Sequence, residues 1–295
     1  MNDVMIDLSI IIVNWNTKDL LRDCLTSVRQ HTTGLEYEII IVDNDSSDGS
    51  PDMVRADFPD ATLIANPDNR GFAAANNQAI AVALGRAVIL LNSDTELTEN
   101  SLEVLYRFLN SRDEIGAVGG KLVYPWGAPQ WSYGYAPSLC RMLWITVSGL
   151  LRIPWGRKPA AVIPAEGEPA HPVEYIVGAD LMVRKSVLDQ VGLLDESFFA
   201  YFEETDLCTR IRQAGYPVWY TPQTRIVHRI GSSFSAQSVD RLTTYYTSLF
   251  GYLKKHRRGW RITKGYLLAK FGMHALAWDQ EAARRVRSIW RSKPD

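Results

Sequence analysis

Three short polar segments contain residue types that could bind a nucleotide, hold a metal ion or move a proton. The first is the loop Asp43–Ser50, which places three carboxylates within six residues. Carboxylate oxygens of this kind can accept hydrogen bonds from a nucleobase or a ribose. Asp, Asn, Ser and Gly also favour an ordinary solvated turn, so both interpretations stay open on the residues alone.

The second segment is Asn92-Ser93-Asp94, which follows an apolar run. Hard divalent cations prefer carboxylate and carbonyl oxygens, so Asp94 could hold such an ion against a diphosphate. Because Asp94 is the one carboxylate of this segment, a metal would need further ligands, and His228 is one candidate. An acidic loop before a helix and a structural histidine are the alternatives.

The third segment, Leu194–Asp206, has the densest mixture of acidic and aromatic residues. Glu203, Glu204 and Asp206 open a predicted helix, where acidic side chains interact favourably with the helix dipole. The surrounding aromatic residues would also desolvate a carboxylate and raise its pKa, as a general base near neutral pH requires.

The first half of the chain alternates strand and helix signals. Apolar, β-branched runs predict strands at Leu8–Val13, Glu38–Val42, Thr62–Ala65 and Ala87–Leu91. Helices are predicted at Leu20–Val28, with Thr17 as N-cap, and from Pro51, with Ser50 as N-cap. Two more are predicted at Phe72–Leu84, which ends before Gly85, and around Leu102–Leu109. This alternation predicts a parallel α/β sheet, in which ligands bind beyond the carboxyl ends of the strands. The chemistry is therefore expected in the loops after Val13, Val42 and Leu91.

The second half is less regular. Residues 130–172 are rich in Trp, Pro and Gly, contain the apolar stretch Leu139–Leu151, and predict a long excursion from the sheet. Regular elements are predicted again as a strand at Glu174–Val177, a helix at Phe202–Ala214 before Gly215, strands at Val218–Tyr220 and Ile226–His228, and a helical tail from about Val239.

Length and composition are those of an ordinary globular enzyme. The 295 residues are 46% hydrophobic and carry 32 Lys and Arg against 33 Asp and Glu, which excludes bulk disorder, collagen and a disulfide scaffold. The charge is uneven, since residues 251–295 hold twelve basic and three acidic side chains. Scattered Cys24, Cys140 and Cys208, no signal peptide and no apolar run of spanning length predict a protein kept in the cytoplasm.

The ordered set of motifs resembles family 2 glycosyltransferases with the GT-A fold. The resemblance covers roughly residues 8–235 and looks closest to the bacterial rhamnosyltransferase-like branch. It is carried by Ile10–Asn16, Val42–Asn44 with Ser47–Ser50, Asn69–Phe72 with Ala75-Asn76, the DxD-type segment Asn92–Asp94, Gly178-Ala179, Leu194–Arg210 and His228. The implied architecture is a GT-A nucleotide-diphospho-sugar transferase: a Rossmann-like, mostly parallel sheet flanked by helices. Its domain would span residues 1–235, with a donor half to about 125 and an acceptor half from 126, before a basic helical extension over 236–295.

The resemblance also implies a role for each matching residue. Asp94 and His228 would bind Mg²⁺ or Mn²⁺, although Asn92 stands where the DxD-type motif commonly begins with Asp. Glu204 falls at the position of the acceptor-activating base, which is commonly Asp in the family, so Glu203 and Asp206 remain rivals. Donor-binding positions are Val13, Asn14, Asp43, Asn44, Asn69, Arg70, Gly71, Asn76, Asn92 and Ser93. Acceptor-side positions are Gly178, Ala179, Asp180 and Tyr201.

The implied function is inverting, metal-dependent transfer of a sugar from a nucleotide-sugar donor. The branch favours rhamnose from dTDP-rhamnose, moved to a hydroxyl of a glycan or polyprenyl-linked saccharide in cell-surface polysaccharide assembly. A UDP-hexose donor is an alternative. A nucleotidyltransferase would need a glycine-rich basic loop after the first strand, which Asn14–Thr17 does not provide. A noncatalytic sugar-binding module also stays open because of Asn92 and Glu204.

Trp and basic residues together suit an anionic membrane surface. They recur in Lys254–Lys264, in Arg284–Arg291 and, with apolar neighbours, in Leu139–Trp155. We therefore expect peripheral association with the inner face of the cytoplasmic membrane. The alternatives are a basic helix packed on the acidic body and a dimer contact. No nucleic-acid partner is expected, because no recognition motif accompanies the charge.

Overall fold

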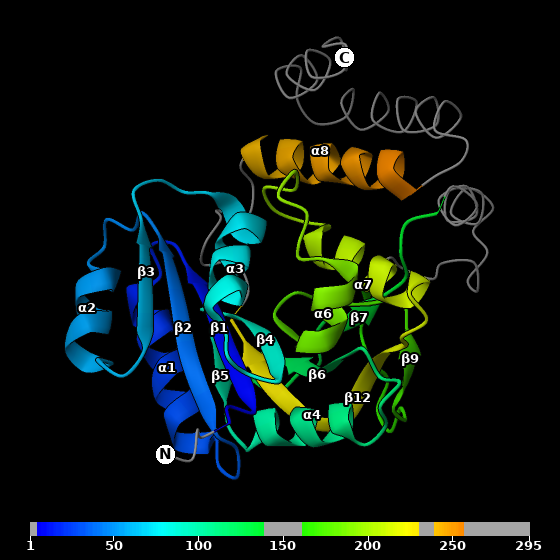
Figure 1. Cartoon of the computed structure of the whole chain (residues 1–295), viewed down its shortest axis with the longest axis horizontal. Helices are drawn as coiled ribbons and strands as arrows, with labels where there is room; N and C mark the ends of the chain where they lie inside the picture. Colours follow the sequence, from blue (N-terminus) through cyan, green and yellow to red (C-terminus); the bar gives the residue numbers. More distant parts are fainter. Residues whose placement is uncertain (1–4, 139–160, 230–238, 257–295) are drawn as a thin grey trace.

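A computed structural model describes residues 5–138, 161–229 and 239–256 (Figure 1). The strands are β1 Leu8–Asn14, β2 Tyr37–Asn44, β3 Thr62–Asn66, β4 Ala87–Asn92, β5 Thr95–Leu97, β6 Ala117–Val123, β7 Tyr133–Gly134, β8 Ala161–Val162, β9 His171–Val173, β10 Tyr175–Ile176, β11 Asp180–Arg184 and β12 Val218–His228. The helices are α1 Lys18–His31, α2 Ser50–Asp57, α3 Gly71–Val82, α4 Ser101–Asn110, α6 Lys185–Val191, α7 Glu203–Gln213 and α8 Val239–His256.

The central sheet has the strand order β3-β2-β1-β4-β11-β6-β12-β5, and β9 pairs with β12 at one end. Strands β3, β2, β1 and β4 are parallel, and β6 is parallel to β12. Strand β11 is antiparallel to both β4 and β6, so β4 and β6 run in the same direction. Val13 is level with Val42 on β2 and with Asn92 on β4, which brings the polar strand ends to one edge.

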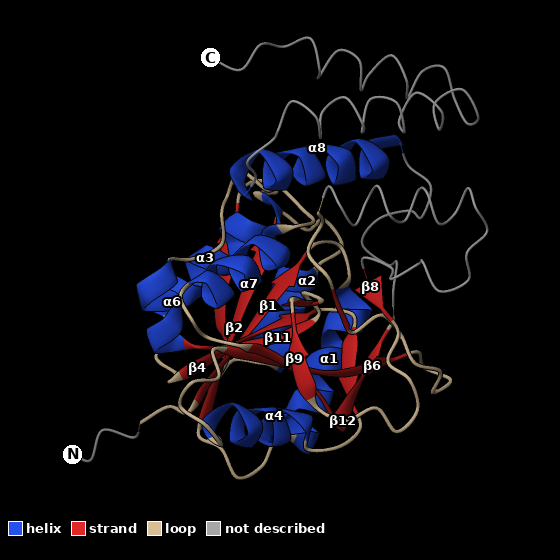
Figure 2. Cartoon of the chain, turned by 90° about the vertical axis from the view of Figure 1, so that its right-hand side faces the viewer, coloured by secondary structure: helices blue, strands red, loops and turns tan. Residues whose placement is uncertain are grey.

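Helices cover both faces of this sheet (Figure 2), which explains the unbroken apolar strands. Ile10 and Ile12 of β1 join a core with α1, α2 and α4, whereas Ile11 joins a core with α3, α6 and α7. All three are fully buried. Burying such a side chain stabilises the fold by about 1.5–3 kcal/mol relative to exposure. The predicted α/β architecture with flanking helices is confirmed.

Several predicted boundaries in the first half are wrong in detail. Ser50 is the first residue of α2, and Gly49, with φ 80°, occupies the N-cap position instead. Thr17 does precede α1 but makes no capping hydrogen bond, because its hydroxyl donates to Asn14 Oδ1 (2.6 Å). Helix α3 ends at Val82, two residues before the predicted end.

The second half contains more sheet than predicted. The two strands expected around Val218 and Ile226 are one strand, β12, with a register shift between Tyr220 and Arg225. The predicted excursion contains β7 and β8, which form a small antiparallel sheet with β10, and β9, which pairs with β12. Strands β5, β6 and β11 and helix α6 were not predicted at all. The stretch Leu139–Leu151 lies outside the described residues.

Helix α8 packs against the segment before α7 and lies above α7 in the view of Figure 1. Its Leu249, Tyr252 and Leu253 share an apolar cluster with Phe198 and Phe202. The proposed division of the chain at residue 235 stays a prediction, and residues 257–295 lie outside the described part. Among the residues that the structure describes, no helix is both long enough and apolar enough to cross a membrane.

Candidate active site

A cavity of about 320 Å³ lies at the carboxyl edge of the sheet. Its wall combines the ends of β1, β2, β4 and β12 with the start of α3, the β10–β11 turn and the segment before α7. The sequence-predicted residues that line it are Val13, Asn44, Asn69, Gly71, Asn92, Ser93, Asp94, Gly178, Ala179, Tyr201, Glu203, Glu204 and His228. The structure thus brings together candidate donor, metal and base positions that are up to 215 residues apart in the sequence.

The candidate metal ligands meet where β4 and β12 end. His228 Nε2 lies 3.3 Å from Asp94 Oδ1 and 3.3 Å from Asn92 Nδ2. Both Asp94 and His228 are buried, with less than a tenth of each residue exposed. One carboxylate and one imidazole nitrogen this close together could share a single cation.

Within the described ranges, no group of three or more His, Cys, Asp and Glu side chains is arranged to hold a metal ion. The described side chains at this edge of the sheet therefore do not provide a complete set of metal ligands. Mg²⁺ commonly keeps waters and takes one or two carboxylates together with substrate phosphates. The Asp94–His228 pair could hold a divalent cation of that kind, whose remaining ligands a diphosphate would supply.

Glu203 and Glu204, in the first turn of α7, line the same cavity. The two preceding residues, Tyr201 and Phe202, have left-handed φ values of 68° and 69°, which turn the chain sharply into the helix. Gly178 lies next to Glu204: a Cβ on this glycine would be 3.6 Å from the Glu204 side chain. Glu204 is partly exposed, whereas Glu203 is buried.

Burial raises the pKa of both glutamates, and the neighbouring Glu204 charge adds to the increase for Glu203. Hydrogen bonds to the main chain and from Thr205 oppose part of the shift of the Glu204 pKa. Oε2 of Glu203 is buried without a hydrogen-bond partner, so it is the glutamate whose charged form is less favourable. Glu204 is the better placed of the two to exchange a proton with a bound molecule.

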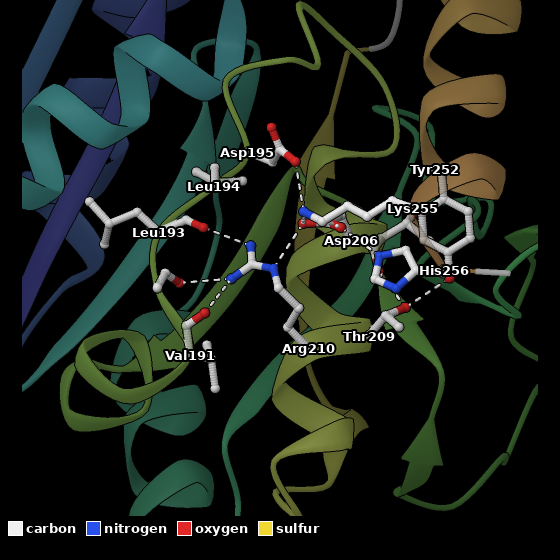
Figure 3. Close-up of polar contacts among 12 residues, drawn as sticks. Val191, Leu193, Leu194, Asp195, Asp206, Thr209, Arg210, Tyr252, Lys255 and His256 are labelled. Carbon is white, nitrogen blue, oxygen red and sulfur yellow. Dashed lines mark hydrogen bonds and ion pairs between the residues drawn. The ribbon is translucent and has the colours of Figure 1, made fainter.

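Asp206 does not line the cavity and is engaged elsewhere (Figure 3). Its fully buried carboxylate accepts from Arg210 Nε (2.9 Å), Lys255 Nζ (2.9 Å) and His256 Nε2 (2.6 Å). Burial works to raise the pKa of Asp206, but the hydrogen bonds from His256 and Lys255 and the Arg210 charge outweigh it and lower the pKa. This carboxylate connects α7 to α8 and is not placed to act as the base.

A hydrogen-bonded network holds the donor-side loops together. Asn14 Nδ2 donates to Asp43 Oδ2 (2.8 Å), and the Ser46 amide donates to Asp43 Oδ1 (2.9 Å). Thr17 continues the network through its hydroxyl, which lies 2.6 Å from Asn14 Oδ1 and 2.9 Å from Ser93 Oγ. Asn14 and Asp43 are buried and lie behind the cavity wall, so they shape the loops that line it.

Three further predicted residues also lie outside the cavity lining. Arg70 is half-exposed and its Nε lies 3.6 Å from Asp68, whereas Asn76 is buried and donates to the Phe72 carbonyl (2.8 Å). Asp180 is buried within β11, where its Oδ2 accepts from the Gly120 amide (2.7 Å). Burial raises the pKa of Asp180 to about 8, opposed in part by that hydrogen bond.

The cavity has apolar lining that the candidate list did not include. Trp15, Phe72, Val177, Phe199 and Ala200 complete the wall. Phe72 and Phe199 belong to motifs that carried the family resemblance, so a signal was present, but pattern alone does not tell a wall residue from a core residue. Phe72 donates its amide to the Phe199 carbonyl (2.9 Å), which joins the donor-side and acceptor-side loops.

The fold and this cavity define a class of protein: a GT-A transferase, and the solved structures similar to this chain share that fold. One is the mannosyltransferase PcManGT from Pyrobaculum calidifontis in complex with GDP-Man and Mn²⁺, at 18% identity and a TM-score of 0.58, covering 99% of this chain and 79% of that one. Another is GalNAc-T7 with UDP, GalNAc and Mn²⁺, at 14% identity and a TM-score of 0.58, covering 82% of this chain and 48% of that one. The match of residues 9–163, more than half of the chain, to glycosyl transferase family 2 then gives the particular family: the chain belongs to it and is a glycosyltransferase.

Curated relatives agree with this assignment. Residues 87–278 also match glycosyl transferase family group 2. The chain is 29% identical over 237 residues to N-acetylglucosaminyl-diphospho-decaprenol L-rhamnosyltransferase of Mycobacterium tuberculosis, covering 75% of this chain and 76% of that protein. It is also 29% identical over 211 residues to the low-salt glycan biosynthesis hexosyltransferase Agl10 of Haloferax volcanii, covering 70% and 62%. The predicted family and enzyme class are confirmed, which leaves the nucleotidyltransferase and the noncatalytic module without support.

Proposed function

We propose that this glycosyltransferase is an inverting, divalent-cation-dependent enzyme that moves a sugar from a nucleotide-sugar donor to an acceptor hydroxyl. One observation carries the proposal: Glu204 lines the same cavity as the Asp94–His228 pair. A proton acceptor and a pair of candidate metal ligands that line one cavity of about 320 Å³ could act on the same bound sugar.

In this mechanism Glu204 accepts the proton of the acceptor hydroxyl while that oxygen attacks the anomeric carbon. The bond to the nucleoside diphosphate breaks on the opposite face, so the configuration at the anomeric carbon inverts. When bound to Asp94 and His228, Mg²⁺ or Mn²⁺ would neutralise the charge of the leaving diphosphate. Val13, Asn44, Asn69, Gly71 and Ser93 would contact the donor, held in place by the Asn14–Asp43 network behind them.

For the donor we propose dTDP-rhamnose. Support comes from the relative named as an L-rhamnosyltransferase, which the chain matches over three quarters of both lengths. A UDP-hexose is the second candidate, favoured by the hexosyltransferase relative and by the neighbour solved with UDP. The nucleobase and the sugar of the donor are therefore the two variables that a binding experiment has to separate.

For the acceptor we propose a polyprenyl-linked saccharide or another glycan in cell-surface polysaccharide assembly, bound beside Gly178, Ala179 and Tyr201. The decaprenol in the name of the mycobacterial relative supports a lipid-linked acceptor. Such a substrate fits a cytoplasmic enzyme associated peripherally with the inner face of the membrane. One basic residue counted toward the membrane-binding tail, Lys255, is engaged with Asp195 and Asp206 instead.

Calorimetric titration of the purified protein with dTDP, UDP and GDP, each with Mn²⁺ and again with chelator, tests the donor half of the proposal. We expect metal-dependent binding of one nucleotide, dTDP first. Tight binding of UDP alone would select the hexose alternative. Absence of binding by all three nucleotides under both conditions would contradict the proposal.

Glu204→Gln tests the base. A positioned base contributes about 10²–10⁴ in rate, so this variant should lose at least a hundredfold in turnover with its nucleotide affinity unchanged. Glu114→Gln is the matched control, because Glu114 is exposed in the loop before β6. A Glu204→Gln variant with near wild-type turnover would move the base to another residue.

A further inference from the structure

The candidate metal ligand His228 is contacted from behind by a residue of a distant loop. Gln130 follows β6 and is almost fully buried, with 1% of its surface exposed. The main-chain amide of Gln130 donates to the Leu122 carbonyl (2.8 Å), and its main-chain carbonyl accepts from Ser132 Oγ (3.2 Å). These two bonds hold the backbone at Gln130 in place independently of its side-chain contacts.

The side chain of Gln130 reaches His228 through two hydrogen bonds. Nε2 donates to the His228 main-chain carbonyl (2.5 Å), and Oε1 lies 3.1 Å from His228 Nδ1. A main-chain carbonyl can only accept, so the amide end that faces it must be the NH₂ group. The other end, the oxygen, must then face Nδ1, and an oxygen acceptor requires that Nδ1 carries a proton.

This assignment determines the state of the other ring nitrogen. In a neutral imidazole with the proton on Nδ1, Nε2 presents its lone pair. Two groups lie 3.3 Å from Nε2: Asn92 Nδ2, an amide that can donate to this lone pair, and Asp94 Oδ1, which can only accept. A nitrogen lone pair and a carboxylate oxygen repel each other at this separation, and a shared cation turns that repulsion into attraction.

We propose that Gln130 is a positioning residue that holds His228 in the Nδ1-protonated tautomer and so presents Nε2, beside Asp94, to a divalent cation. The inference rests on the proposed metal-dependent function and assigns to it a residue that lines no part of the cavity. Hydrogen bonds from outer residues typically change metal affinity by about 10–100-fold when they are removed.

The test compares the wild-type protein with Gln130→Met, which keeps the side-chain length but cannot hydrogen-bond to the ring. Electron paramagnetic resonance would measure Mn²⁺ affinity in the presence of dTDP or UDP. Long-range ¹⁵N–¹H NMR spectra without metal would report the His228 tautomer, with His228→Gln used to identify its signals among the five histidines. Gln190→Met is the matched control, since Gln190 is exposed on α6.

We expect the wild-type ring to be protonated on Nδ1, and Gln130→Met to bind Mn²⁺ about 10–100-fold more weakly. Nucleotide binding in chelator should not change. Gln130→Glu should recover most of the affinity, because a buried carboxylic acid can donate to the His228 carbonyl and accept from Nδ1. A structural role alone would lower the melting temperature without moving the tautomer.

Three results would overturn the inference: wild-type Mn²⁺ affinity in Gln130→Met, an Nε2-protonated ring in the wild type, or a doubly protonated ring paired with Asp94. If Gln130→Met does not fold, the wild-type spectrum and Gln130→Glu still decide the matter. If the wild type binds no Mn²⁺ with either nucleotide, the metal part of the proposed function fails. The tautomer spectrum then still shows separately whether Gln130 controls the ring.

Discussion

Gly71, at the start of α3, lies close to Phe199 in the segment before α7, and both residues line the cavity. It begins α3 with φ 80°, a conformation that L side chains rarely adopt. A Cβ at this position would lie 2.5 Å from the Phe199 carbonyl oxygen and 2.8 Å from Phe199 Cδ2. The same carbonyl accepts from the Phe72 amide, so it cannot move away without losing that bond.

These contacts set the expected cost of Gly71→Ala. Left-handed backbone costs a residue with a Cβ about 1–2 kcal/mol. Overpacking against a fixed carbonyl adds about 1–3 kcal/mol. Lower entropy of the unfolded chain returns about 0.4–1 kcal/mol. The net loss of unfolding free energy is about 1–4.5 kcal/mol. Each kcal/mol lowers the melting temperature by about 2–4 °C.

Gly127→Ala separates strain from contact. Gly127 has φ 86°, but a Cβ there would meet nothing within 4 Å. Its expected cost is the backbone strain less the entropy term, about 0–1.5 kcal/mol. The contact with Phe199 should therefore appear as a difference of about 1–3 kcal/mol between the two variants.

Urea unfolding followed by circular dichroism would measure both variants, and calorimetry would measure their nucleotide affinity. We expect Gly71→Ala to be the less stable protein and also to bind nucleotide more weakly, because the alanine displaces the Phe199 wall. Equal stability of the two variants would refute the packing argument at Gly71. A destabilised Gly71→Ala with unchanged nucleotide affinity would show that the Phe199 wall does not shape the donor site.

Three other predictions follow from the charges of the site. Turnover should fall as the pH drops through the raised pKa of Glu204, because the base must be ionised, so a pH–rate profile that stays flat down to pH ~4.3, the ordinary glutamate value, would contradict this role. Asp94→Asn should weaken Mn²⁺-dependent nucleotide binding at least tenfold, with binding in chelator unchanged; calorimetry that shows equal loss in both conditions would contradict a metal role. Lys255→Met should lower the unfolding free energy by about 1–2 kcal/mol at pH 7, because Lys255 is partly exposed and Asp206 keeps its bonds from Arg210 and His256. The pKa of Asp195 (about 2) and the pKa of Asp206 are both lowered in the folded protein. The stabilisation is therefore complete at pH values above the pKa of an unfolded aspartate, and it is lost as the pH falls through the two folded-state pKa values. The unfolding free energies of the wild type and Lys255→Met in urea should converge toward pH 2.

The donor side of the fold was the easier part to predict from sequence. Strands β1, β2 and β4 are buried on both faces, so each is an unbroken apolar run that local pattern reveals. Strand β6 was missed because Gly119 and Gly120 interrupt its apolar pattern. Both glycines stand close to distant neighbours: a Cβ on Gly119 would lie 2.3 Å from Ile176, and a Cβ on Gly120 would lie 3.2 Å from Asp180 Oδ2. Such reasons exist only after the chain has folded.

The candidate site shows the same division. Asp94 and His228 could be named because strand ends at one sheet edge must converge. Asp206 could not be separated from Glu204 by sequence, since both are acids in the first turn of one helix. Two of the three groups that engage Asp206, the Lys255 ammonium and the His256 imidazole, come from α8, about fifty residues later. Local pattern identifies the acids, but tertiary contacts decide which of them faces the cavity.

The contacts of α8 also explain how a strained turn can sit beside the proposed base. Tyr201 and Phe202 hold consecutive left-handed conformations, which cost about 1–2 kcal/mol per residue. Ser248 donates to the Ala200 carbonyl (2.7 Å), and Lys255 ties Asp195 to Asp206 across the same segment.

These contacts lie on both sides of the turn, so they can offset its strain and hold Glu204 toward the cavity. Helix α8 falls in the region assigned by sequence to the basic extension, yet its described contacts support the turn that precedes Glu204. Changes that displace α8 should therefore reach the proposed base through this turn, even though α8 itself does not line the cavity.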